Sequence, residues 1–274
     1  MDAWSAAAGS VLAFSAVVYA LAARRNRRRA RAATRRRRRQ IAAFAAGWLT
    51  LVVALLSPLH HLAGTLLSAH MLQHLLLVTV AAPLLVLGSP LALGLAAAPP
   101  SIRGRVARWR CWPPVRMAER AARPATAAVI FGVALWGWHA PRLFQAALVH
   151  EWVHVAEHAS LLGTAVLFWW ALARRRRDGG VATLCLFVTT SHAALLAVLL
   201  TLAPTVWYPA QGHGNRWGLT ALEDQQLAGL IMWVPCALAF VVAGLAVFAR
   251  WLGEAERRVS RSPLGRAARG PRLG

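Results

Sequence analysis

Long apolar segments alternate with runs of arginine along this chain, and that alternation limits what it can fold into. Each apolar segment has about the 20 residues that a helix needs to cross a bilayer. Of all residues 58% are hydrophobic and 15% are charged, whereas soluble domains contain about 25% charged residues. We therefore expect an all-α, polytopic membrane helix bundle of about seven spans, at residues 4–23, 41–59, 69–97, 125–145, 151–173, 181–203 and 225–251.

Two of these spans carry helix-breaking residues. Pro83 and Pro90 fall inside the third segment, so we expect its helix to be kinked or to end early. His139 and Pro141 interrupt the fourth segment, which predicts a span to about residue 138 followed by a short interfacial helix.

The arginines predict the orientation. The net charge of +22 comes from arginine alone, and 29 of the 31 arginines fall within 24–39, 103–123, 174–177 and the stretch from Arg250 to the end. With seven spans, these four segments lie on one side of the membrane. The positive-inside rule makes that side cytoplasmic, which puts the N-terminus outside and the C-terminus inside. Asp2 before the first apolar run, with arginines after it, favours a retained span over a cleaved signal.

The same runs bear on partners. A basic chain can bind nucleic acid, but these arginine runs alternate with spans and lack interleaved aromatic residues. They are typical of topology signals, so we expect no nucleic acid partner and some contact with anionic lipid at the cytoplasmic face.

Histidines gather where arginines are absent. This topology puts nine of the ten histidines at or near the outer ends of the spans, and His192, midway along a span, is the exception. In "HMLQH" and "HEWVHVAEH" the histidines are four residues apart, so they share a helix face. The second row descends about 12 Å from the surface. Such pairs can bind one metal ion, and ionisable groups inside spans generally mark function. The pairs are His70 with His74 and His154 with His158.

Three further residues extend this predicted metal site. Glu157 adjoins His158 and is positioned to hold its far ring nitrogen as a supporting partner. Asp224 and Met232 are eight residues apart on nearly the same face of the last span. Met232 falls at the depth of His158, where a thioether would suit Cu(I), although packing in the core is an equally open role for a helical methionine.

The remaining histidines have simpler expected roles. We expect His60, His61 and His213 to be interfacial anchors and His192 to be a buried hydrogen-bonding residue. His150 lies at the water boundary, where solvation and metal binding are both open.

Four ordered blocks resemble the multi-span CtaG family of cytochrome c oxidase assembly factors. They are "SAHMLQHLLLVTVAAPLLVLGSP", "WHAPRLFQAAL", "HVAEHASLLGTAVLFWWAL" and "WGLTALEDQQLAGLIMWVP". The resemblance covers residues 41–252, which we expect to form a six-helix membrane core. Outside it we expect a first helix with a basic cytoplasmic loop at 1–40 and a basic, disordered cytoplasmic tail at 253–274. It implies metal ligands at His70, His74, His139, His154, His158, Asp224 and Met232, supported by Gln73, Glu157, Gln225 and Gln226.

The resemblance also implies a function. The chain is expected to be a non-enzymatic, multi-pass protein of the bacterial cell membrane that helps to mature a haem–copper oxidase. Its expected cargo is copper, received from an extracytoplasmic donor and delivered to oxidase subunits.

Two enzymatic alternatives stay open. One is a seven-span metallo-hydrolase that uses zinc, for which "HEWVH" is a literal HExxH match with Glu151 as the base. Against it, Glu151 stands at the helix start, and the family blocks align on His154 and His158. The other is a di-iron oxygenase with histidine boxes, which is less favoured because its electron supply would be cytoplasmic.

Overall fold

A computed structural model describes residues 3–27, 34–113, 115–116, 119, 123–174, 179–209 and 218–261. Throughout these ranges the regular structure is helical, which confirms the predicted all-α class. His213 and residues 262–274 lie outside them, as do parts of the arginine runs at 28–33 and 175–177.

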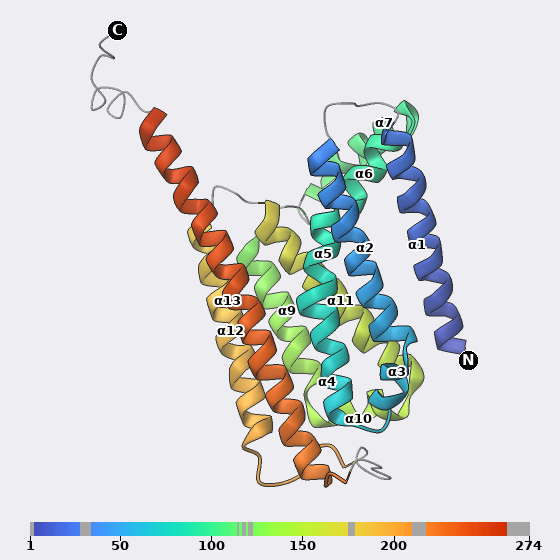
Figure 1. Ribbon diagram of the computed structural model, residues 1–274, viewed down its shortest axis with the longest axis vertical. Helices are drawn as coiled ribbons and strands as arrows, with labels where there is room; N and C mark the ends of the chain where they lie inside the picture. Colours follow the sequence, from blue (N-terminus) through green and yellow to red (C-terminus); the bar gives the residue numbers. More distant parts are fainter. Residues whose placement is uncertain are drawn as a thin grey trace.

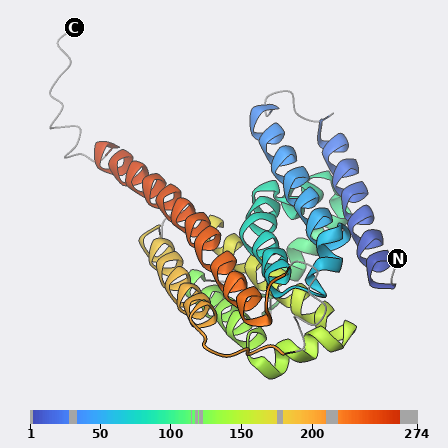
Figure 2. The same ribbon diagram turned by 60° about the horizontal axis from the view of Figure 1, so that its bottom comes forward.

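The long helices lie side by side as a bundle (Figure 1). They are α1 (Ala3–Arg27), α2 (Thr34–Leu56), α9 (Pro124–Trp138), α11 (Glu151–Arg174), α12 (Gly179–Thr201) and α13 (Ala221–Arg261). One further crossing is built from short pieces, α4 (Leu67–Leu75), the π-helix η1 (Leu76–Ala81), α5 (Ala82–Gly88) and α6 (Pro90–Ala97). In two views α1 and α13 flank the bundle on opposite sides, and the last part of α13 extends away from it (Figure 2).

Five helical segments of the described chain are long and apolar enough to span a membrane. They are Arg35–Leu56, Leu67–Ala97, Glu151–Arg174, Gly179–Thr201 and Ala221–Glu254. α9 is apolar but shorter, and α1 is not among the five. The protein is therefore multi-pass, while the count of seven and the outward N-terminus stay predictions.

Local chemistry explains where the helices break. α9 ends at Trp138 and α10 (Pro141–Val149) starts at a proline, which confirms the predicted short helix after the fourth segment. α5 ends where Ser89 adopts left-handed backbone angles, with φ of 48°, directly before Pro90. α13 continues to Arg261, so the tail expected to be disordered from residue 253 begins as helix.

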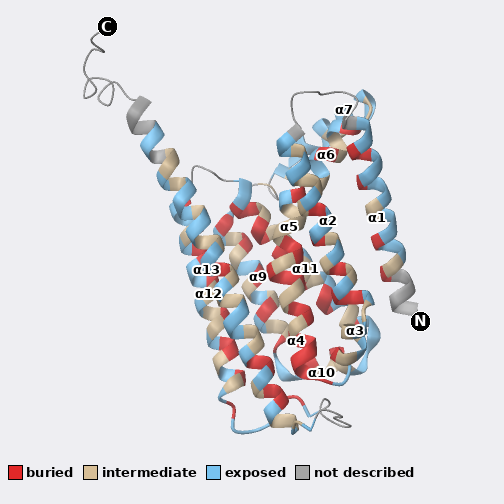
Figure 3. Ribbon diagram, in the orientation of Figure 1, coloured by how far each residue is buried: buried red, intermediate tan, exposed pale blue. Residues whose placement is uncertain are grey.

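The two ends of the bundle differ in character. The start of α2, the helix α7 (Pro100–Cys111) and the far end of α13 lie toward one end, and all three bear arginine (Figure 1). The helix α3 (Pro58–Ala63), α4 and α10 lie toward the other end. Burial is concentrated inside, along α4 and α11, while α1 and α13 are largely exposed (Figure 3). Of the histidines in the described residues, all but His192, midway along α12, therefore fall at the end of the fold away from these arginine-bearing segments.

Candidate metal centre

The two predicted histidine pairs face one another across α4 and α11. The His70 ring centre is 5.4 Å from that of His154 and 5.6 Å from that of His158. The ring centres of His74 and His158 are 5.0 Å apart. Four imidazoles from two helices thus meet in one place, because residues four apart share a helix face.

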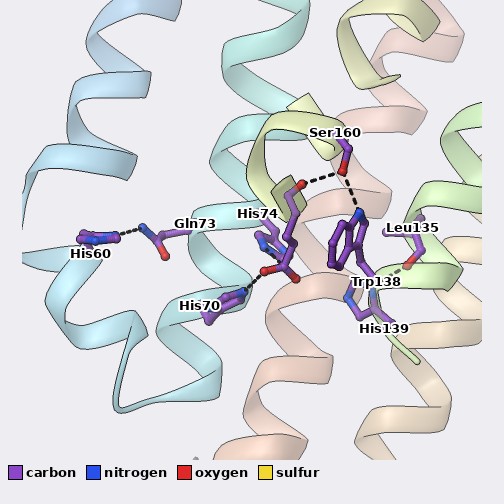
Figure 4. Close-up of polar contacts among 9 residues, drawn as sticks. His60, His70, Gln73, His74, Leu135, Trp138, His139 and Ser160 are labelled. Atoms are coloured by element: carbon purple, nitrogen blue, oxygen red, sulfur yellow. Dashed lines mark hydrogen bonds and ion pairs between the residues drawn. The ribbon is translucent and has the colours of Figure 1, made fainter. Parts of the chain in front are cut away.

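Glu157 lies inside this group of rings. Its Oε2 is 3.4 Å from His70 Nε2 and its Oε1 is 3.7 Å from His74 Nε2. The side chain is completely buried. The sequence predicted that Glu157 would support its neighbour His158. Instead, its carboxylate reaches across to α4, whose His70 and His74 appear as sticks in Figure 4.

Four potential ligand atoms converge on one point. One atom each from His70, His154, Glu157 and His158 lies within 4.8 Å of all the others. We call these residues the four-ligand group. None of their converging atoms has a hydrogen-bond partner: His70 Nε2, His154 Nε2, both Glu157 oxygens and both His158 ring nitrogens. Leaving buried polar atoms without hydrogen bonds is costly, and burying a carboxylate whose contacts to His70 and His74 are 3.4 and 3.7 Å long is more costly still. A bound cation would satisfy all of them at once, so the residues fit a metal ion.

Two further imidazoles adjoin the four-ligand group. Both ring nitrogens of His74 are buried without a hydrogen-bond partner. His139 Nδ1 donates to the Leu135 carbonyl over 2.7 Å, which leaves Nε2 unprotonated, buried and unpartnered. Its ring centre is 6.2 Å from that of His74. The predicted ligands His74 and His139 therefore lie beside the group with lone pairs to offer, although neither belongs to it.

A second layer holds this end of the site rigid. The buried phenol of Tyr208 donates to the His139 carbonyl over 2.7 Å, and burial raises the pKa of Tyr208, so the phenol stays a donor. The Trp138 indole donates to Ser160 Oγ over 2.7 Å, and Ser160 donates to the Glu157 carbonyl over 3.1 Å (Figure 4). α9 and α11 are thereby joined next to the carboxylate.

Asp224 performs a different task from the one predicted. Its Oδ2 accepts from the Leu67 amide over 2.7 Å, and its Oδ1 accepts from the Ser68 amide over 3.1 Å. The Ser68 hydroxyl donates to the same Oδ1. Asp224 therefore caps the N-terminus of α4 from another helix and lies outside the four-ligand group.

The other predicted residues of α13 also lie in structural contacts. Gln225 Oε1 accepts from the Trp207 amide over 2.7 Å, and Gln225 Nε2 donates to the Thr205 carbonyl over 3.1 Å. Met232 packs against an apolar cluster that includes Leu67 and Met71. Gln226 is half-buried. The predicted thioether is thus part of apolar packing.

The HExxH match is not assembled as a catalytic site. His150 and Glu151 are both exposed, and of the three motif residues His154 alone contributes to the four-ligand group. Glu151 is the first residue of α11 and is exposed, whereas the carboxylate in the four-ligand group is that of Glu157.

Sequence reasoning missed the position of His60. Its ring lies 5.7 Å from the His154 ring, and its Nδ1 is 3.4 Å from the Gln73 amide nitrogen. His60 belongs to α3, outside the aligned blocks, and shares no helical spacing with the other histidines. Gln73 is itself fixed, because its amide nitrogen donates to the Ala54 carbonyl over 2.6 Å. His192, by contrast, accepts from the Trp136 indole over 3.3 Å, as a hydrogen-bonding residue would.

Comparison with known proteins places this chain within a family. The chain is 28% identical over 229 residues to Uncharacterized protein Mb0105 of Mycobacterium bovis and to Uncharacterized protein MT0111 of Mycobacterium tuberculosis. Each match covers 78% of this chain and 35% of the relative, so the chain spans about a third of the length of these proteins. No solved structure matches it. The family model described as "Cytochrome c oxidase caa3 assembly factor (Caa3_CtaG)" matches residues 17–254, and the chain therefore belongs to that family.

Proposed function

We propose that this protein binds copper at the four-ligand group and hands it to a subunit of a caa3-type cytochrome c oxidase. The observation that carries the proposal is the buried carboxylate of Glu157, whose two oxygens lack hydrogen bonds among unpaired imidazole nitrogens. The family supplies the process, which is oxidase assembly. The nitrogen and oxygen donor atoms of the group indicate the kind of ion that is carried, which is a divalent transition metal.

The ligand chemistry favours copper among divalent ions. Imidazole suits copper and zinc alike, but Cu²⁺ binds a given nitrogen and oxygen donor set more tightly than Zn²⁺ does. The group contains no thiolate, and Met232 packs in an apolar cluster, so the donors suit Cu²⁺ better than Cu⁺. His74 and His139 are available as alternative ligands during exchange. We infer ligand exchange, with no bond of a substrate made or broken by the protein.

Orientation follows from the arginines. The arginine-bearing α7 and the arginine-bearing ends of α2 and α13 lie at the opposite end of the bundle from α3 and α4, which carry four of the histidines (Figure 1). Under the positive-inside rule this puts the metal centre at the outer face of the cell membrane. An extracytoplasmic copper donor and an oxidase subunit can then both reach it, and the arginines face anionic lipid on the cytoplasmic side.

Metal content of the detergent-purified protein tests the proposal. We expect copper to copurify or to bind stoichiometrically to the wild type, and the variant His70→Ala/His74→Ala to lose it. His154→Ala should impair both copper binding and oxidase activity in cells, whereas Glu151→Gln should be nearly silent. Zinc as the bound metal, together with damage from Glu151→Gln equal to that from His154→Ala, would refute the proposal and support the hydrolase alternative.

A further inference from the structure

Two histidines of α3 connect the buried cluster to the surface. The ring centres of His61 and His60 are 5.9 Å apart, and those of His60 and His154 are 5.7 Å apart. Beyond His154 the rings of the four-ligand group follow at 4.2 and 5.4 Å. The imidazoles therefore form one continuous row that starts outside the set of residues assigned to the metal centre.

Burial increases along this row. His61 is exposed, His60 and His154 are half-buried, and His70 and His158 have only 1% and 3% of their surface exposed. α3 joins the ends of two candidate spans, Arg35–Leu56 and Leu67–Ala97, so His61 lies at a membrane boundary. The row thus leads from a boundary position to the centre of the bundle.

The spacing of the rings allows a metal ion to move from one imidazole to the next while it stays coordinated. Two imidazoles that share one ion, with metal–nitrogen bonds of about 2.1 Å, have ring centres roughly 5–6 Å apart. The ring centres of His61 and His60, of His60 and His154, and of His154 and His70 are 5.9, 5.7 and 5.4 Å apart, near that separation. An incoming ion can therefore bind the next ring before it leaves the last one. This avoids the large cost of an uncoordinated charge inside the membrane.

The contacts of His60 suit a transient step. An amide nitrogen can only donate, so the Gln73 contact makes His60 Nδ1 an acceptor and leaves the ring proton on Nε2. Nε2 then has no lone pair to offer, and Nδ1 can bind a metal ion only by giving up the Gln73 contact, which weakens binding to this ring. The Ser57 cap and the packing of α3 on α4 hold the ring beside His154. A relay site needs this combination of fixed position and modest affinity.

We propose that His61 and His60 form a capture site that takes a copper ion from the aqueous boundary and relays it through His154 to the four-ligand group. This rests on the proposed copper function and adds the route by which the site fills. A residue on a route changes loading and release by the same factor, because both directions cross the same barrier. A ligand of the final site would instead change the equilibrium dissociation constant.

The test uses the full chain in detergent and Cu²⁺ supplied as a weak glycine complex. Loading is followed by quenching of the fluorescence of the 13 tryptophans, and release by transfer to a strong chelator. We expect His61→Ala and His60→Gln each to slow loading and release by roughly tenfold or more, within the range over which variants of one site alter association rates. The dissociation constant and the final stoichiometry should stay at the wild-type values.

His150→Ala is the matched control, because His150 is also exposed near the start of α11 but stacks against Trp152 instead of the row. It should load like the wild type. Unchanged loading and release rates in both α3 variants would overturn the relay. Slower loading that is explained by a raised dissociation constant, or by a lowered unfolding temperature of the variant, would overturn it as well. A wild type that binds no Cu²⁺ would instead overturn the proposed function, so the two failures are distinguishable.

Discussion

Removing the side chain of Asp224 should loosen the helix that carries His70 and His74. The carboxylate accepts from two backbone amides at the start of α4 and from the Ser68 hydroxyl. α4 has no capping side chain of its own, since its N-cap residue is Leu66. Asp224→Ala therefore leaves the Leu67 and Ser68 amides buried and unpaired at a helix N-terminus.

The contacts set the size of the effect. Each buried donor left without a partner costs about 1–3 kcal/mol, and loss of an N-cap acceptor alone costs about 0.5–2 kcal/mol. Because these terms overlap, we expect a loss of about 3–5 kcal/mol. For a chain of this size that corresponds to a fall of roughly 6–20 °C in the unfolding temperature. Asp224→Asn keeps one acceptor oxygen and should lose less.

The assay combines thermal unfolding in detergent with a copper titration. Glu223→Ala is the control, because it removes the same charge from the neighbouring exposed position, where Glu223 caps its own helix. We expect Asp224→Ala to unfold at a much lower temperature than Glu223→Ala, and to bind copper with normal stoichiometry while folded. If Asp224→Ala is as stable as Glu223→Ala yet binds no copper, Asp224 is a ligand and the capping argument is wrong.

Three further outcomes are expected. Glu157→Gln should lower copper affinity at least tenfold, as disrupted metal sites typically show. It should also raise the unfolding temperature of the metal-free protein, because a buried carboxylate with only the 3.4 and 3.7 Å contacts to His70 and His74 costs more than an amide. A less stable metal-free variant would contradict this. Gly229→Ala should lower the unfolding temperature, because the added Cβ would lie 2.8 Å from a backbone carbonyl of α12. Gly244→Ala adds a Cβ with nothing within 4 Å and should raise the free energy of unfolding by about 0.5–1 kcal/mol. Equal shifts in the two variants would contradict the packing argument. In intact cells, an impermeant thiol reagent should label Glu151→Cys but not the native, exposed Cys111, and the reverse pattern would invert the topology.

The sequence predicted the features that depend on local periodicity. Helical spacing put His70 with His74 and His154 with His158, and the structure brings these pairs face to face. Pro141 predicted the break between α9 and α10. Both inferences need only the geometry and the breaking residues of a single helix, which one sequence contains.

The features that were missed depend on contacts between distant segments. Asp224 is 157 positions from its partner Leu67, and no local pattern distinguishes a carboxylate that caps another helix from one that binds metal. His60 reaches His154 because α3 turns back over α4. Glu157 faces α4 instead of its neighbour because residues next to each other on a helix point about 100° apart.

The π-helix η1 directly follows the turn that carries His74. Each such wide turn holds one more residue than an α-turn, so it resets the angular register between the helix segments on its two sides. If the same residues, Leu76–Ala81, were wound as continuous α-helix, α4 would be rotated relative to α5 by about 100°. The imidazoles would then turn away from α11 while α5 kept its packing against α2. The π-helix thus lets the histidines of α4 face α11 while α5, in the same span, packs against α2.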